Sequence, residues 1–249
     1  GIAMASGAES ACQVAQLVLL NSDFAALPKV VAEGRRVINN IQRAASLFLV
    51  KNIFSLFLSI ISLFTVMPYP LEPIHLSVIS AMTIGVPSFI LTFEPRYDRV
   101  KGRFLPEVLR RAFPGGLTNV FVVLLCQLFM VVFALPQDEV STICAAILSF
   151  VGLLVLYQIC KPFNWFRRLL WWAMAAGIVL CFTLLGDILD LRTWTDEVRL
   201  VMFTLLVMTP TVFLAIQRIF DWCEQTRLRF AAWCRGVWAK RPFRKKKKA

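Results

Sequence analysis

Apolar residues fill six long stretches of this chain, and most charged residues lie between them. The stretches are Ala45–Met67, Ile74–Phe93, Leu117–Leu135, Val140–Cys160, Leu169–Leu189 and Val198–Ile219. Each has a length of about 20 residues, which an α-helix needs to cross the hydrocarbon core of a bilayer. One buried core helix can imitate such a stretch, but six in tandem favour an integral membrane protein. The alternation typical of barrel strands is not seen, so the pattern predicts a mainly α, polytopic membrane protein with six transmembrane helices.

The composition supports this prediction, because 58% of the residues are hydrophobic and only 17% are charged. Lys and Arg concentrate in the connections at 94–112 and 161–168 and in the tail, whereas 68–73 and 136–139 carry none. Basic connections mark the cytoplasmic side, so both termini are predicted to be cytoplasmic. The net charge of +12 is therefore mainly a topology signal. The basic run at 241–248 fits lipid headgroups better than nucleic acid, and no nucleic-acid partner is predicted.

The first forty residues predict a small α/β element. "GIAM" (1–4) and "LVLL" (17–20) resemble buried strands, and 5–16 resembles a turn and a short helix. Continuous apolar strands around a helix indicate a parallel sheet covered on both faces. Two strands cannot close such a core, so we expect this element to be the remnant of a Rossmann-like domain in a longer protein.

A single long helix is predicted after this element. No proline interrupts the sequence from Lys29 to Met67, and Gly34 is its only glycine. A helix with Gly34 as a point of bending therefore runs from the α/β element into the first span. It either transmits motion into the membrane or is an ordinary connector, and continuity alone leaves both open.

Polar residues inside the first span mark a candidate transport site. Asn52, Ser55, Ser59 and Ser62 recur at helical spacing, so they lie near one face, and Lys51 is adjacent to them. A lysine within a membrane helix is functional by default unless it snorkels to the interface, and we favour function for Lys51. The serines at 59 and 62 fit helix packing better than transport.

The second span carries a matching polar stripe. Ser77, Ser80 and Thr83 lie close around the helix, and Gly85 and Pro87 follow them. Glycine and proline loosen the backbone, so that freed carbonyls can coordinate an ion or take part in gating. Ser77 alone fits packing better. The two stripes together predict a transport path between the first two spans.

Cysteine usage adds no further site. The seven cysteines contain no C-x-x-C pair, so neither a disulfide framework nor a zinc site is predicted. Neither a catalytic residue nor a resident metal ligand is assigned.

Several short motifs occur in order along the amino-terminal part of the chain. They are Gly-Ile-Ala-Met at 1–4, Ser-Gly at 6–7, Asp-Phe at 23–24, Glu-Gly-Arg at 33–35, Asn-Asn at 39–40, and Thr83, Gly85, Pro87, Phe93 and Pro95. These residues resemble the P-type ATPases, in particular bacterial calcium and magnesium pumps. They are similar to the end of that family's phosphorylation domain, of the HAD type, and to its fifth and sixth membrane helices. The likeness is detailed over about residues 1–95 and topological beyond.

The resemblance implies the carboxy-terminal part of an ATP-driven cation pump in the plasma (inner) membrane. Residues 1–40 are then the end of the phosphorylation domain and a stalk, 41–95 the core transport helices, 96–220 four support helices, and 221–249 a basic cytoplasmic tail. ATP and Mg²⁺ are implied as cofactors bound by the upstream part of the same protein, and none by this stretch. The other implied partners are the lipid bilayer and the transported cation.

The resemblance also implies site roles. Asn52, Ser55, Ser80 and Thr83 stand where calcium pumps of the family place ligands, and Lys51 is implied as a counter-charge. Asn52 and Thr83 agree with those pumps, whereas the carboxylates expected at Ser55 and Ile84 are missing. Two full calcium sites are therefore not expected, because hard divalent cations prefer charged oxygen ligands.

Two alternative functions stay open at this point. The Lys51–Asn52 pair is similar to a lipid-flipping branch of the family, which makes a lipid or polyamine flippase the second hypothesis. A non-enzymatic six-helix channel or accessory protein is the third.

Overall fold

The computed structural model describes residues 1–65, 70–100, 102–133, 136–184 and 196–239. Within them, six helical segments are long and apolar enough to cross a membrane. They are α2 (Leu27–Phe64), the segment Pro73–Thr92, α5 (Phe104–Phe133), α6 (Gln137–Cys160), α7 (Trp165–Leu184) and α8 (Asp196–Ala239). The predicted six-span helical pattern is confirmed, and the predicted span ends at Met67, Leu135 and Leu189 lie outside the described residues.

Two helices extend well beyond their predicted spans. Helix α5 begins at Phe104 rather than near Leu117, and α8 continues past Ile219 to Ala239. Hydropathy marks where a helix crosses the bilayer, but a helix can continue into water when its polar side chains are solvated or paired. At the start of α5, Glu107 accepts hydrogen bonds from Arg110 and Arg111 one turn later, which supports helix there.

The amino-terminal α/β element has the predicted order. Strand β1 (Ile2–Met4), helix α1 (Glu9–Val14) and strand β2 (Leu17–Leu19) follow one another, and β1 pairs with β2 in parallel, with Ala3 opposite Val18. The two strands form the whole of this sheet within the described residues. The larger Rossmann-like domain therefore stays a prediction.

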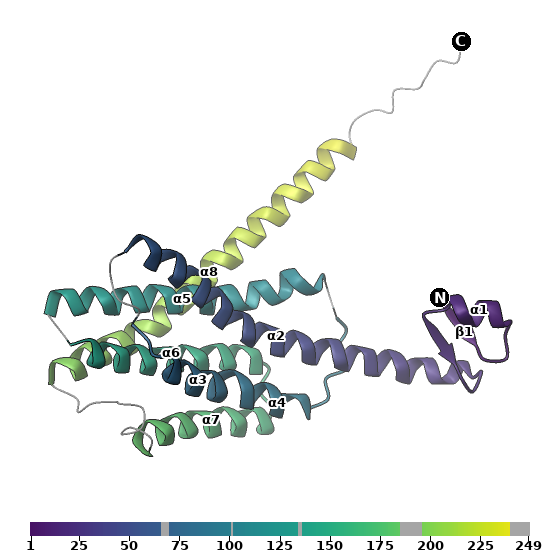
Figure 1. Cartoon of the computed structure of the whole chain (residues 1–249). Helices are drawn as coiled ribbons and strands as arrows, with labels where there is room; N and C mark the ends of the chain where they lie inside the picture. The colour runs from purple at the N-terminus through teal and green to yellow at the C-terminus, as the bar shows by residue number, and fades with distance from the viewer. Residues whose placement is uncertain (66–69, 101, 134–135, 185–195, 240–249) are drawn as a thin grey trace, which may run out of the picture.

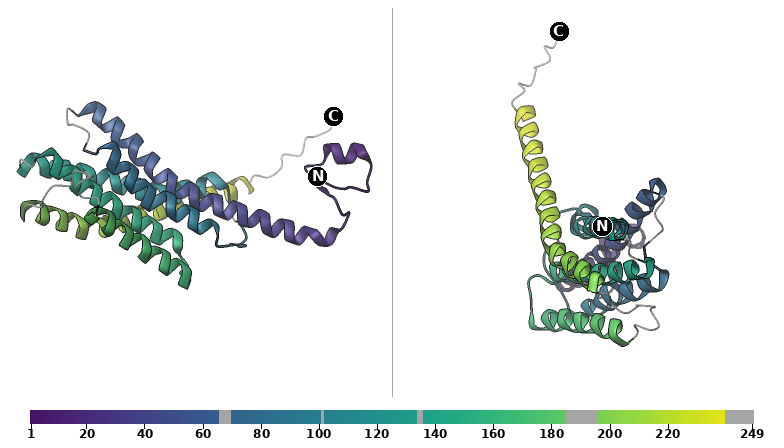
Figure 2. Two further views of the ribbon diagram at one scale, coloured as in Figure 1. Left: turned by 60° about the horizontal axis from the view of Figure 1, so that its bottom comes forward. Right: turned by 90° about the vertical axis from the view of Figure 1, so that its left-hand side faces the viewer.

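Helix α2 joins this element to the membrane bundle without a break. Its entry is a 3-10 turn, η1 (Phe24–Ala26), capped by the Asp23 carboxylate, which accepts a hydrogen bond from the Ala25 amide at 2.8 Å. The helix passes through Gly34 and continues to Phe64, as predicted. Figures 1 and 2 show the α/β element at the far end of α2, outside the bundle.

Helix α6 is the core of the bundle. It packs against α5, α8 and α7 and against the second span, and α5 in turn packs along α2. The second span has three parts: helix α3 (Pro73–Ser80), a π-helical turn η2 (Ala81–Gly85) and helix α4 (Val86–Thr92). Figure 2 shows the helices running roughly side by side along the bundle.

An ion network ties the basic connections together at one end of the bundle. Glu94, just after α4, accepts hydrogen bonds from Arg167 Nε at 2.7 Å and from Arg43 Nη1 at 3.5 Å. Both arginines are buried. At the same end, Arg110 of α5 pairs with Asp221 of α8. The outer half of α2 and the distal half of α8 therefore leave the bundle at the same end, as the predicted topology requires.

Candidate transport site

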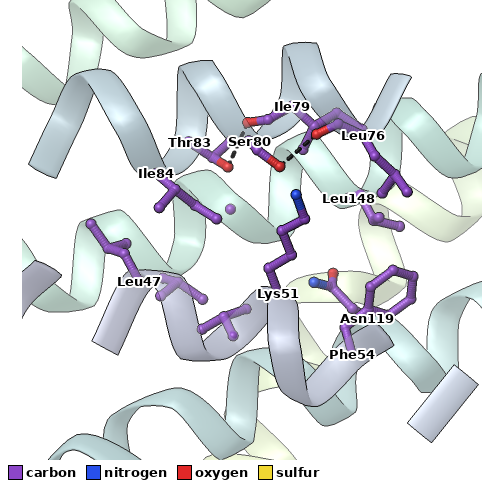
Figure 3. Close-up of a pocket in the computed structure, with 13 residues that line it drawn as sticks. Leu47, Lys51, Phe54, Leu76, Ile79, Ser80, Thr83, Ile84, Asn119 and Leu148 are labelled. Carbon is purple, nitrogen blue, oxygen red and sulfur yellow. Dashed lines mark hydrogen bonds between the residues drawn. The ribbon is translucent and has the colours of Figure 1, made fainter. Parts of the chain in front are cut away.

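A small cavity lies among α2, the second span, α5 and α6, within the apolar stretches (Figure 3). Its wall is mostly aliphatic, and four polar side chains reach it: Lys51, Ser80, Thr83 and Asn119. The centres of water-sized molecules can occupy a volume of about 40 Å³ inside this cavity. Since one water needs roughly 10–15 Å³ of such space, the cavity can hold a few waters or a partly hydrated ion.

The two hydroxyls of the second span are bonded to their own helix. Ser80 Oγ donates to the Leu76 carbonyl at 2.5 Å, and Thr83 Oγ1 donates to the Ile79 carbonyl at 2.7 Å. A hydroxyl oxygen that donates its proton still has lone pairs free to accept. Ser80 and Thr83 therefore present oxygen acceptors to the cavity. Figure 3 shows the Lys51 amine directed toward these two hydroxyls.

The other two polar groups have no partner among the described residues. Asn119 is 5% exposed, and its carbonyl oxygen Oδ1 is buried without a hydrogen bond. Lys51 is half-buried, and its ammonium forms no ion pair with any described residue. A buried polar atom without a partner, such as Asn119 Oδ1, costs about 1–3 kcal/mol, so it is a feature that function can explain.

The backbone of the second span is irregular where it meets the cavity. The turn Ala81–Gly85 is π-helical, and Pro87 follows it in the first turn of α4. Proline donates no backbone hydrogen bond, so one carbonyl of this turn loses its usual donor. Single π-helical turns occur often at functional sites. The predicted loosening around Gly85 and Pro87 is thus located beside Thr83.

Close helix contacts fix the cavity walls. A Cβ atom on Gly152 of α6 would lie 2.5 Å from Thr83 Cγ2, and one on Gly116 of α5 would lie 2.5 Å from Ile53 Cγ2. Small residues let membrane helices approach closely. These two glycines hold the second span and α2 against α6 and α5.

The structure brings together only some of the residues predicted for the site. Lys51, Ser80 and Thr83 meet at the cavity, but Asn52 and Ser55 lie on an exposed face of α2 and do not line it. The site roles of Asn52 and Ser55 therefore stay predictions. Of the two residues predicted to take part in gating, Gly85 is exposed and Pro87 is buried, and their role stays a prediction.

Sequence reasoning missed Asn119. The signal was present, because Asn119 is one of two amides in an apolar run, with Gln127, and it follows the Gly115–Gly116 pair. Its proximity to Lys51 depends on how α5 packs against α2, which the sequence pattern does not reveal.

The donor set of the cavity is poor in negative charge. No group of three or more His, Cys, Asp or Glu side chains that could hold a metal occurs among the described residues. The cavity offers neutral oxygens and one ammonium, whereas hard divalent cations prefer charged oxygen ligands. A cation bound here would need a carboxylate from elsewhere.

Comparisons with known proteins agree with the membrane bundle. No family model matches the chain. A probable cation-transporting ATPase (exp7) of Streptococcus pneumoniae is 33% identical over 87% of this chain, and the calcium-transporting ATPase CtpE of Mycolicibacterium smegmatis is 37% identical over 74%. A P-type sodium-transporting ATPase of Plasmodium falciparum is 27% identical over 66%. The chain belongs to the P-type ATPase family.

The matched region is a minor part of these P-type ATPases. It makes up 29% of the Streptococcus pneumoniae protein, 25% of the Mycolicibacterium smegmatis protein and 13% of the Plasmodium falciparum protein. The similarity to the first relative extends over 227 residues, well past the amino-terminal third from which the resemblance was first inferred.

Proposed function

We propose that this chain is the membrane part of an ATP-driven cation pump and that its cargo crosses the bilayer at the Lys51 cavity. The carrying observation is that Lys51, an unpaired amide oxygen of Asn119 and two hydroxyls belong to one cavity between apolar helices, beside a π-helical turn. The names of the relatives, which include calcium-transporting and cation-transporting ATPases, support a cation as cargo, and Ca²⁺ is our candidate.

ATP hydrolysis is assigned to a longer protein of which this chain forms the carboxy-terminal part. The relatives are several times longer than the matched region, which supports this assignment. ATP with Mg²⁺ would supply phosphoryl transfer in that upstream part. Helix α2 would carry the resulting motion, because it links the α/β element to the cavity without a break.

Lys51 would act as a built-in counter-charge. Two unit charges 4 Å apart repel by about 4 kcal/mol at an effective dielectric constant of 20. An ammonium and a cation therefore exclude one another from so small a cavity unless a carboxylate joins them. We infer that Lys51 pairs with an upstream acid when the cargo has left and moves aside when cargo is bound.

The neutral oxygens would complete the coordination of the cargo. Asn119 Oδ1 accepts no hydrogen bond from any described residue, so a small movement that opens it to the cavity would free it to bind a cation. The hydroxyls of Ser80 and Thr83 already have their protons directed away into the helix, so their lone pairs can accept. Asn52, on the exposed face of α2, would face an upstream helix and contribute from there.

We also propose that the end of the bundle with Arg43, Arg110 and Arg167 faces the cytoplasm of a cell whose plasma membrane holds the pump. The support is the excess of Lys and Arg at that end. Both described ends of the chain would then be cytoplasmic.

Replacing Lys51 tests the counter-charge. In the longer protein, Lys51→Met should slow dephosphorylation about tenfold or more, because the empty site would hold an uncompensated acid. Its control is Lys29→Met, which removes an exposed lysine near the start of α2 that forms no ion pair with any described residue. Equal turnover in both variants would show that Lys51 only anchors the helix at the interface.

Replacing Asn119 tests the ligand set. Asn119→Leu keeps the side-chain size and removes an unpaired buried oxygen, so the protein should fold at least as well. The cation concentration for half-maximal ATPase should rise about tenfold, the usual value of one good polar contact to a charge. An unchanged cation dependence in this variant would place the transport site elsewhere.

A further inference from the structure

A second, basic pocket lies at the end of the bundle that holds the ion network. It is formed by the outer part of α2, the connection between α4 and α5, and the first turns of α5. Its volume is about 330 Å³, and five arginines line it against one acid, Glu107. This pocket is separate from the Lys51 cavity and shares no lining residue with it.

The innermost donors of this pocket have no acceptor among the described residues. Gln42 is 5% exposed and its Nε2 is buried without a hydrogen bond. Arg43 is 3% exposed, and its Nε and Nη2 are likewise unpaired. Exposed Arg99 lines the same pocket without an ion pair to any described residue. Three side chains that line one pocket therefore carry N–H donors that no described residue accepts from.

The acids nearby are already shared among the other arginines. Glu107 pairs with Arg110 and Arg111, Glu94 takes one arm of Arg43, and Asp98 pairs with Arg96 and has its pKa lowered by that hydrogen bond. Asp221 and Glu224 of α8 reach only Arg110. No described carboxylate reaches the free donors of Gln42, Arg43 and Arg99, so the inner pocket keeps a positive surplus.

The pocket lies at the depth of lipid headgroups. Arg43 comes directly before the apolar stretch of α2, and Arg110 comes about 10 Å of helix before Leu117. The headgroup layer of a bilayer borders the hydrocarbon core, so residues just before an apolar span lie in that layer. Basic pockets between membrane helices at this level can bind anionic headgroups.

We propose that Gln42, Arg43 and Arg99 form a binding site for a phosphate-type oxyanion, most simply the phosphate of an anionic phospholipid. The oxyanion accepts from Gln42 Nε2 and from the free Nε and Nη2 of Arg43, and Arg99 closes the site from the outside. Arg43 also contacts Glu94 and thereby the entry of α7, so the bound headgroup supports the network that joins α2 to the rest of the bundle.

Lipid binding to the full-length protein tests the site. The protein is purified in a nonionic detergent and titrated with phosphatidylglycerol, with phosphatidylcholine and with inorganic phosphate, and bound ligand is counted by native mass spectrometry. Arg99→Gln should weaken phosphatidylglycerol binding about tenfold and Gln42→Leu about fivefold, because each removes hydrogen bonds to a charged acceptor. The matched control is Arg103→Gln, an exposed arginine of the same connection that does not line the pocket. It should change affinity less than twofold.

Titration with phosphatidylglycerol and with inorganic phosphate distinguishes a lipid phosphate from a free phosphate ion as the bound oxyanion. Phosphatidylglycerol binding that millimolar phosphate does not displace identifies the lipid headgroup, and inorganic phosphate binding with the same variant pattern identifies the free ion. The proposal fails if Arg103→Gln weakens binding as much as Arg99→Gln, which would indicate diffuse surface charge. It also fails if no variant changes the affinity for either ligand. Both test variants should fold, because Arg99 is exposed and Gln42→Leu removes an unpaired donor.

Discussion

Substituting Gly152 by alanine tests how tightly α6 packs on the π-helical turn. An alanine Cβ there would lie 2.5 Å from Thr83 Cγ2 and 2.7 Å from Thr83 Cβ. Rotation of the threonine side chain moves Cγ2 but not Cβ, which is fixed to the backbone. Carbon atoms in contact lie about 3.5–4.0 Å apart, so α6 and the second span must separate by roughly 1 Å.

The expected cost follows from overpacking. Forcing one extra methyl group into a packed interior costs about 1–3 kcal/mol, and alanine returns up to about 1 kcal/mol through its better helix propensity. We therefore expect Gly152→Ala to destabilise the protein by about 1 kcal/mol. The same displacement changes the position of Thr83 relative to Lys51 and Asn119, so the affinity of the cavity for a cation should also fall.

Thermal unfolding in a mild detergent, followed by circular dichroism, measures this cost. The control is Gly34→Ala in the exposed part of α2, where an added Cβ meets nothing within 4 Å. That variant gains helix propensity alone and should be stabilised by about 0.5–1 kcal/mol. At about 2–4 °C per kcal/mol, the two variants should differ in Tm by roughly 5 °C. If Gly152→Ala melts as high as Gly34→Ala, the close contact with Thr83 does not exist.

Two further predictions concern the basic end of the bundle. Glu94→Gln should destabilise the protein by about 3 kcal/mol in the same unfolding assay, because buried Arg43 and Arg167 would lose their shared carboxylate. The control is Glu9→Gln on the exposed α1, which should change the stability little. A stable Glu94→Gln protein would mean that the network contributes nothing to the bundle. In a background without native cysteines, Gln137→Cys should react with an impermeant thiol reagent in intact cells, and Arg103→Cys only after permeabilisation. The reverse pattern would invert the proposed topology.

The type and order of the helices and strands, and the membrane class, could be predicted from the sequence alone. Six apolar stretches of spanning length can satisfy their backbone groups only as helices in a bilayer, so periodicity and length suffice. The unbroken helix through Gly34 and the parallel pairing of β1 with β2 were also predictable, because both follow from local signals. The resemblance carried by short motifs identified the family, which the comparisons bear out.

Helix ends were less predictable for a physical reason. The hydrophobic pattern marks the part of a helix that lies in the bilayer. The start of α5 lies outside that part, where ion pairs such as Glu107–Arg111 support the helix. The pattern therefore located the membrane spans but underestimated the lengths of the helices α5 and α8.

Only the tertiary structure decided which polar residues meet. Lys51 and Asn52 are adjacent in the sequence, and the polar pattern assigned both to one site. Adjacent residues of a helix point about 100° apart, however. Packing directs Lys51 to the cavity and leaves Asn52 exposed. Asn119 joined the cavity because Gly116 lets α5 approach Ile53 closely. The basic pocket likewise depends on contacts between α2 and a connection more than fifty residues away, such as the hydrogen bond from Asn39 Nδ2 to the Arg96 carbonyl. Such contacts are set by how side chains of different helices fit together, and no pattern within one helix records that fit.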